Sequence, residues 1–181
     1  MENEIKINEN ITIRIANEKW AKEKYDSAMK SREQLLPWLP WVHFYDNQEN
    51  GAEMMAKFQR SKVKEFEEKT NYCYDIFYDG QFAGSIEVMH VSEMNKKCEI
   101  GYWLDSDMTG KGIMTTCVKA LTELLFDRLS MHRIAILAAP ENAASCAVAE
   151  RCGYEKEALL REDQVLEDKF YDTVIYAKLM L

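Results

Sequence analysis

The sequence is poor in the residues that form metal centres and disulfide networks. It has three histidines and five cysteines among 181 residues, and no two cysteines form a C-x-x-C pair. His43, His90 and His132 are scattered, whereas a zinc site needs ligands at set spacings. We therefore expect no metal site, and we expect the cysteines to be free thiols in a reducing cytoplasm.

Export signals and long apolar runs are also missing. The chain starts Met1-Glu2-Asn3-Glu4, without the basic and apolar segments of a signal peptide. No stretch approaches the roughly 20 apolar residues that a membrane-spanning helix needs. We expect a cytoplasmic protein that does not associate with a membrane.

Positive charge is outnumbered by negative charge. There are 23 Lys and Arg residues against 31 Asp and Glu residues, which gives a net charge of −8. This balance disfavours direct binding to nucleic acid, because phosphate contacts need a basic face. It suits a cationic partner, such as an amine, a basic peptide or a basic protein. Solubility alone is the other explanation for the acidic charge.

Chain breakers are few, with three prolines and seven glycines, and there is no linker or repeat. We expect one domain over residues 1–181. Hydrophobic periodicity predicts strands at 11–15, 72–77, 82–91, 98–104, 132–138, 154–160 and 171–179. It predicts helices at 18–36, 48–68, 114–125 and 142–151, with an aromatic loop at 37–44. The order is that of a mixed α/β fold.

A glycine-containing loop precedes the third predicted helix. Its residues are Thr109, Gly110, Lys111, Gly112, Ile113 and Met114. The first N–H groups of a helix are unpaired, so such a loop suits a phosphate or pyrophosphate. The dinucleotide and Walker patterns both fail, because Thr115 replaces the third glycine and Gly112 follows Lys111. A plain turn with two glycines is the alternative.

A second segment, Asn142-Ala143-Ala144-Ser145, opens the last predicted helix. Together with the glycine loop it resembles the GNAT acetyltransferases, and within them the bacterial Rim-type enzymes that acetylate ribosomal proteins. The matching pieces, in order over nearly the whole chain, are Ala83-Gly84-Ser85-Ile86, Glu99-Ile100-Gly101-Tyr102-Trp103-Leu104, Gly110-Lys111-Gly112-Ile113-Met114, Asn142-x-x-Ser145 and Gly153-Tyr154.

The resemblance implies a mixed central sheet, splayed at its middle strands and flanked by helices, with acetyl-CoA as co-substrate in the gap. Backbone groups of Trp103 and Leu104 would pair with the pantetheine arm, and the loop at 109–114 would hold the pyrophosphate. The family usually has Gln or Arg at Thr109 and Gly or Ala at Met114, so we expect rearranged contacts there.

The resemblance also implies Ser145 as the general acid for the leaving thiolate, oriented with the pantetheine by Asn142. Helix capping by both residues is the alternative reading. A carboxylate of the Rim enzymes aligns with Gln164, which cannot accept a proton.

Several residues remain candidates for the base. Glu162 and Asp163 adjoin Gln164, and Glu87 interrupts an apolar strand, although alternation could also place it on a solvent face. Glu99 matches a family position, although its role could be limited to bracing the fold. A water chain without a dedicated base is a further option.

The aromatic loop lies where the family builds its acceptor groove, so we expect the acceptor near Trp38 and Trp41. A hydrophobic plug or a homodimer contact is the alternative. The predicted function is acetylation of a protein N-terminal α-amine, such as that of a ribosomal protein. A small-molecule amine (an antibiotic, a polyamine or an amino acid) and a non-catalytic acyl-CoA-binding module are the other hypotheses.

Overall fold

The computed structural model describes residues 1–45, 50–166 and 169–180. The strands are β1 (Glu4–Lys6), β2 (Ile11–Ile15), β3 (Tyr72–Tyr78), β4 (Gln81–Ser92), β5 (Lys97–Leu104), β6 (Arg133–Ala138), β7 (Glu155–Leu166) and β8 (Lys169–Leu179). The α-helices are α1 (Ala21–Lys30), α2 (Arg32–Leu35), α3 (Gly51–Glu67), α4 (Ile113–Leu129) and α5 (Ala143–Arg151). Short 3-10 helices are η1 (Glu18–Trp20), η2 (Pro40–Tyr45) and η3 (Ser106–Met108).

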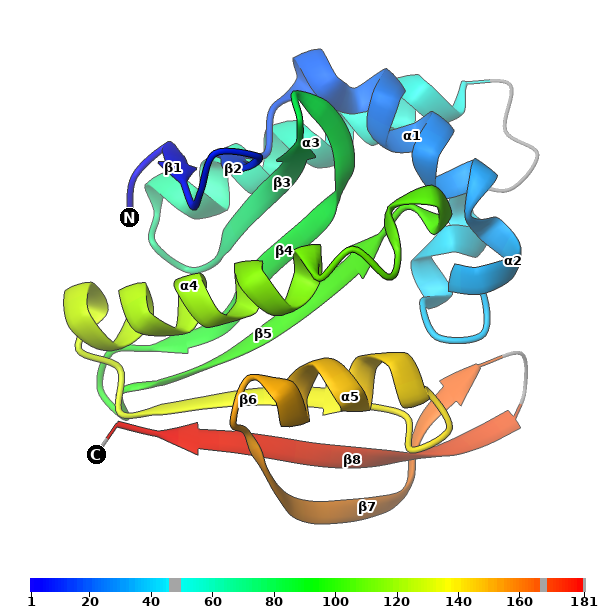
Figure 1. Cartoon of the computed structure of the whole chain (residues 1–181). Coiled ribbons are helices and arrows are strands. Elements are labelled where there is room, and N and C mark those ends of the chain that lie inside the picture. Colours follow the sequence, from blue (N-terminus) through cyan, green and yellow to red (C-terminus); the bar gives the residue numbers. More distant parts are fainter. Residues whose placement is uncertain (46–49, 167–168, 181) are drawn as a thin grey trace.

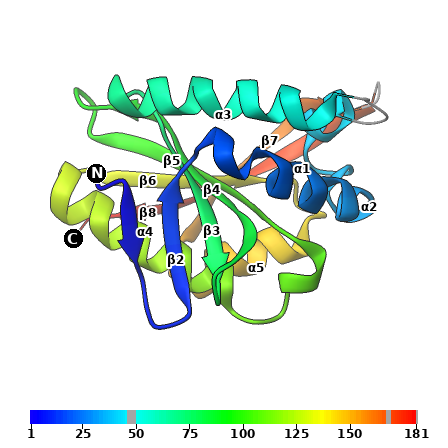
Figure 2. The same cartoon turned by 90° about the horizontal axis from the view of Figure 1, so that it is seen from above.

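All eight strands form one sheet in the order β1-β2-β3-β4-β5-β6-β8-β7. The central pair β5–β6 is parallel and the other neighbouring pairs are antiparallel. Helices α1 and α3 cover one face of the sheet, and α4 and α5 cover the other (Figure 2). The predicted mixed α/β fold with flanking helices is confirmed.

The sheet opens between β5 and β6. Their pairing covers only Lys97–Glu99 against Arg133–Ala135, although β5 continues to Leu104 and β6 to Ala138. Beyond Glu99 the two ribbons diverge, with the start of α5 on one side and α2 on the other (Figure 1). The predicted splay at the middle strands is therefore confirmed, and the part of β5 beyond Glu99 has a free edge toward β6.

The prediction of one continuous helix at 18–36 is wrong. The helix is divided at Ser31, whose buried hydroxyl accepts the N–H of Ser106 at 2.9 Å. This tether turns the chain into α2 and fixes it against the loop that follows β5. The aromatic segment predicted as a loop contains η2 from Pro40 to Tyr45.

The helix predicted at 48–68 begins at Gly51, and residues 48 and 49 lie outside the described residues. Gly51 packs on Tyr25, because a β-carbon there would lie 2.2 Å from the tyrosine ring. Strand β1 was missed, since three residues are too few to show an alternation. Strand β7 runs to Leu166, past the predicted end at 160, through a register shift between Leu160 and Gln164.

A charged network lies buried between α1, α3 and the sheet. The Lys24 ammonium contacts Asp75 Oδ1 at 2.9 Å, Gln59 Oε1 at 3.1 Å and Ser85 Oγ at 3.3 Å. Gln59 donates to Asp75 Oδ2 at 2.8 Å, and all four side chains are buried. Burial alone would lower the pKa of Lys24, but the charge of Asp75, its hydrogen bond to Lys24 and the nearby Glu87 and Cys73 together outweigh burial and raise that pKa, so the lysine stays charged.

Replacing Lys24 alone should strongly destabilise the protein. Lys24→Met leaves Asp75 as an uncompensated buried charge, and we expect urea unfolding to show a loss of about 3–5 kcal/mol. The double variant Lys24→Met with Asp75→Leu removes both charges and should recover most of that loss. If the double variant loses as much stability as Lys24→Met, the ion pair does not organise this region.

Candidate active site

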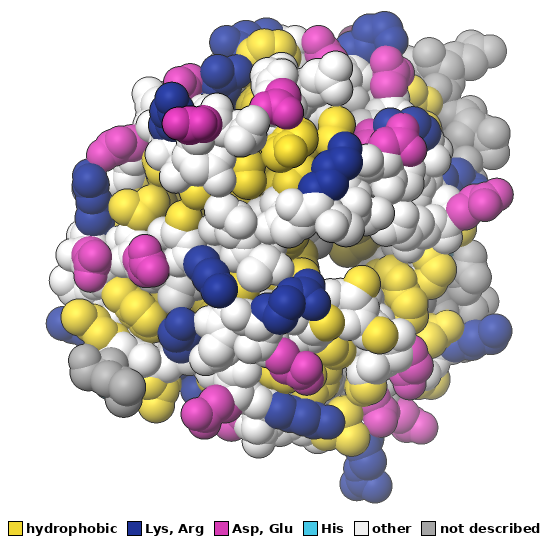
Figure 3. All heavy atoms as spheres, viewed as in Figure 1, with side chains coloured by type: hydrophobic (Ala, Val, Ile, Leu, Met, Phe, Trp, Pro, Cys, Tyr) yellow, Lys and Arg dark blue, Asp and Glu magenta, His cyan; other side chains and the backbone are white. Residues whose placement is uncertain are grey.

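A cavity of about 130 Å³ lies at the opening between β5 and β6. Its walls come from α2 and the residues after it, the end of β5, and the starts of α4 and α5. The predicted residues among its lining are Trp103, Leu104, Thr109, Met114, Asn142 and Ser145. The space-filling view shows this face hollowed, with hydrophobic side chains along the hollow (Figure 3). The fold therefore brings the glycine loop and the Asn142–Ser145 segment to one place.

The glycine loop has the backbone that an anion site needs. Gly110 and Gly112 have φ angles of 73° and 75°, and a β-carbon on either would meet no atom within 4 Å. The first N–H of α4 with a helical partner is that of Thr116, which donates to the Gly112 carbonyl at 3.0 Å. The N–H groups of the preceding turn therefore have no helical acceptor, and no side chain caps them.

The loop has two buried apolar side chains and two polar ones. Ile113 and Met114 are buried in the core and can offer only backbone groups to a ligand. Thr109 already donates its hydroxyl to the Ser106 carbonyl at 2.9 Å. The exposed Lys111 ammonium contacts the Met108 sulfur at 3.5 Å and the Tyr78 ring at 5.5 Å. Because both contacts are uncharged, the Lys111 charge is available to an anion.

Asn142 and Ser145 have different tasks. The Asn142 Oδ1 atom accepts the N–H of Ser145 at 3.2 Å, so Asn142 is the N-cap of α5. The Ser145 hydroxyl takes no part in capping and donates to the Tyr102 hydroxyl at 3.3 Å. Tyr102 donates in turn to the Ser145 carbonyl at 3.1 Å. Burial raises the pKa of Tyr102 to about 12, so it remains a proton donor at neutral pH.

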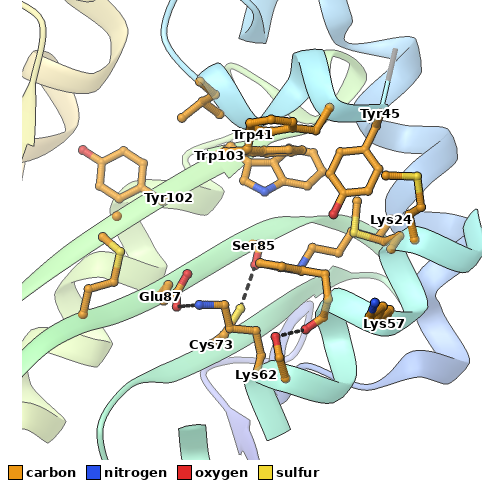
Figure 4. A pocket seen from close by; sticks show the side chains of 18 residues that line it. Lys24, Trp41, Tyr45, Lys57, Lys62, Cys73, Ser85, Glu87, Tyr102 and Trp103 are labelled. Atoms are coloured by element: carbon orange, nitrogen blue, oxygen red, sulfur yellow. Dashed lines mark hydrogen bonds and ion pairs between the residues drawn. The ribbon is translucent and has the colours of Figure 1, made fainter. Parts of the chain in front are cut away.

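A larger pocket of about 800 Å³ lies on the face covered by α1 and α3. Tyr102 and Trp103 line both this pocket and the smaller cavity, so the two meet at the end of β5. In the larger pocket Trp41 packs against Trp103, with ring centroids 5.8 Å apart, and against Tyr45 at 5.9 Å (Figure 4). Trp38 lines the smaller cavity, so only Trp41 occupies the position expected for an acceptor groove.

Glu87 points into the larger pocket and not to bulk solvent. Its side chain is 18% exposed, and its carboxylate binds the Lys62 ammonium at 2.8 Å. Lys62 also binds Glu65 at 3.0 Å. Burial would lower the pKa of Lys62, but its hydrogen bonds to these two carboxylates raise it.

The other acidic candidates lie elsewhere. Glu162 and Asp163 are exposed on β7, and neither lines the two pockets. Glu99 binds His90 Nδ1 at 2.9 Å and is likewise absent from both linings, which agrees with the bracing role.

Sequence reasoning missed Tyr102 and Lys62 as partners of Ser145 and Glu87. It also missed the Lys24–Asp75 pair, although both residues interrupt apolar patterns: Lys24 lies on the buried face of α1, and Asp75 lies within a buried strand. The pocket also contains Cys73, but burial raises the pKa of that thiol to about 12, so Cys73 is not a ready nucleophile.

No described helix has the length and hydropathy needed to cross a membrane. Within the same residues, no three His, Cys, Asp or Glu side chains gather as a possible metal site.

Comparison with known proteins gives a consistent result. YdaF of Bacillus subtilis, provisionally assigned as a ribosomal N-acetyltransferase, is 30% identical over 174 residues, which cover 96% of this chain and 93% of YdaF. The microcin C7 self-immunity acetyltransferase MccE, solved with acetyl-CoA and AMP, superposes with a TM-score of 0.93 at 27% identity, covering 99% of this chain and 98% of MccE.

RimL, the ribosomal L7/L12 α-N-protein acetyltransferase, was solved with coenzyme A. It has a TM-score of 0.91 at 25% identity and covers 98% of each chain. A family model described as "Acetyltransferase (GNAT) domain" matches residues 11–155. The open sheet, the glycine loop and these matches agree, and the chain belongs to the GNAT family of N-acetyltransferases.

Proposed function

We propose that this enzyme transfers the acetyl group of acetyl-CoA to the N-terminal α-amine of a protein, with a ribosomal protein as the first candidate. The observation that carries the proposal is the meeting of two pockets at Tyr102, one beside the glycine loop and one beside Glu87. The choice of acceptor rests on YdaF and RimL. In this proposal residues 1–181 act as one domain in the cytoplasm, where ribosomal proteins are made.

The smaller cavity would receive the thioester end of acetyl-CoA. Free N–H groups at the start of α4 and the Lys111 ammonium would bind the pyrophosphate, which carries negative charge. The free edge of β5 near Trp103 and Leu104 would pair with the amide groups of the pantetheine arm, as an added strand does. Asn142 would help to position this arm from the start of α5.

The larger pocket would hold the acceptor. Its amine nitrogen attacks the thioester carbonyl carbon, the N–C bond forms, and the C–S bond breaks. Glu87 would take the proton that the amine loses, which requires it to exchange its contact with Lys62 for one with the amine. Ser145 would turn its hydroxyl proton from Tyr102 to the leaving sulfur. Tyr102 would then turn its own proton from the Ser145 carbonyl to the Ser145 hydroxyl oxygen, and solvent would reprotonate Tyr102.

A small-molecule amine is the second candidate for the acceptor. MccE, which has the same fold at a TM-score of 0.93, was solved with AMP in addition to acetyl-CoA. The larger pocket, at about 800 Å³, also falls within the usual range for small-molecule sites. Assays with N-terminal peptides and with free amines will separate the two candidates.

Gly112→Val should weaken acetyl-CoA binding. A branched side chain would enter the open space beside the start of α4, and we expect calorimetry to show a Kd more than tenfold higher. Gly80→Val is the matched control, because Gly80 has a similar φ of 78° and equally open surroundings in the turn between β3 and β4. Equal affinities for acetyl-CoA in the two variants would contradict this placement of the pyrophosphate.

Ser145→Ala should lower kcat about 10²–10⁴-fold, with little change in the KM for acetyl-CoA, because it removes a general acid. Asn142→Ala is the comparison for capping and should cost about 1 kcal/mol of stability. If Ser145→Ala instead lowers Tm and changes kcat less than about threefold, Ser145 is structural.

Glu87→Gln should lower kcat by about 10²-fold or more, because an amide of the same shape cannot accept a proton. Glu65→Gln is the matched control, since Glu65 binds the same lysine but does not line the pocket. Steady-state rates measured across pH should show the loss only in Glu87→Gln. A similar loss in both variants would mean that Glu87 acts only by holding Lys62.

A further inference from the structure

Two of the three lysines that line the larger pocket, Lys24 and Lys62, already have their charges compensated. The Lys24 ammonium has three N–H donors and three acceptors, on Asp75, Gln59 and Ser85. Lys62 is bound by both Glu87 and Glu65. Neither lysine is therefore free to bind a charged group of the acceptor without losing a buried partner.

The lining disfavours a second positive charge on the acceptor. Three ammonium groups line the pocket, on Lys24, Lys57 and Lys62, whereas Glu87 is the only carboxylate among its described lining residues. A polyamine or a basic side chain inside this space would meet these ammonium groups and find no uncommitted carboxylate. The net charge of −8 can still steer a basic protein from a distance, but it does not extend into the pocket.

Most of the rest of the lining is apolar, although it also contains Ser61, Ser85 and Cys73. Its large apolar members include Trp41, Tyr45, Met54, Met55, Phe58 and Trp103. Trp41 and Tyr45 lie toward one side of the pocket, and Tyr102 and Glu87 lie toward the other (Figure 4). Aromatic rings and flexible methionines give a wall that binds large apolar groups of varied shape.

We infer that the acceptor carries a bulky apolar group next to its amine. The group occupies the space between Trp41, Met54 and Phe58, and the amine faces Glu87 and Tyr102. This inference rests on the proposed function, because it names the kind of amine that the same site selects. For a protein acceptor it specifies a large apolar side chain at the N-terminus, and it disfavours polyamines.

The test is a panel of four amines with saturating acetyl-CoA, measured by release of CoA. Methioninamide and phenylalaninamide carry an apolar group beside a single amine, glycinamide has the amine alone, and spermidine has several charges. We expect kcat/KM at least about tenfold higher for the two apolar amides than for glycinamide and spermidine, since burying a large side chain is worth that factor or more.

Variants of the apolar wall complete the test. Met54→Ala and Phe58→Ala should raise the KM for phenylalaninamide about fivefold or more, and change the KM for glycinamide by a much smaller factor. Phe170→Ala, at an exposed phenylalanine on β8, is the control and should change neither KM. Met54→Ala is included because the Phe58 ring centroid lies 5.2 Å from the Lys62 ammonium, so that Phe58→Ala also removes a contact of Lys62.

The outcomes separate this inference from the proposed function. Acetylation of glycinamide or spermidine as efficient as that of the apolar amides would overturn the inference and leave acetyl transfer intact. Equal losses for all amines in both wall variants would also overturn it. No CoA release with these amines or with N-terminal peptides, despite acetyl-CoA binding, would instead contradict the proposed function.

Discussion

The buried ion pair between Lys24 and Asp75 joins the parts from which the larger pocket is made. Lys24 comes from α1, Asp75 from β3, and their shared partners Gln59 and Ser85 come from α3 and β4. Without it, the two helices would cover this face of the sheet mainly by apolar contact, with the Lys62–Glu87 ion pair as a remaining polar link, and apolar contact does not define one orientation. The charged groups require specific partners at specific distances, so they fix how far the helices stand from the strands.

The features that the sequence predicted well are local. The glycine loop is recognisable because two glycines stand between a strand and an apolar helical stripe, and both adopt positive φ angles. The long helix α4 shows its apolar stripe over several turns, and the strands of the sheet centre are long and strongly apolar. Helix capping by Asn142 was also a local pattern, and it does not use the Ser145 hydroxyl, which donates to Tyr102 instead.

The features that the sequence did not predict depend on residues far apart in the chain. Tyr102 and Ser145 are separated by 43 positions, and Lys62 and Glu87 by 25, so no periodic pattern connects them. The division of the first helix at Ser31 depends on a hydrogen bond to Ser106. Trp38 and Trp41 are three positions apart yet line different cavities, because the chain turns into η2 between them. Each of these features exists only once the strands and helices have been assembled.

The short junction between β5 and β6 has a mechanical consequence. Strands β1–β5 and the group β6, β8 and β7 are joined within the sheet by pairing at only three residues of each central strand. A ligand that pairs with the free edge of β5 and also contacts α5 spans this junction. While bound, such a ligand would connect the two parts of the sheet. The rigidity of the enzyme would therefore rise when the thioester binds and fall when the thiol is released.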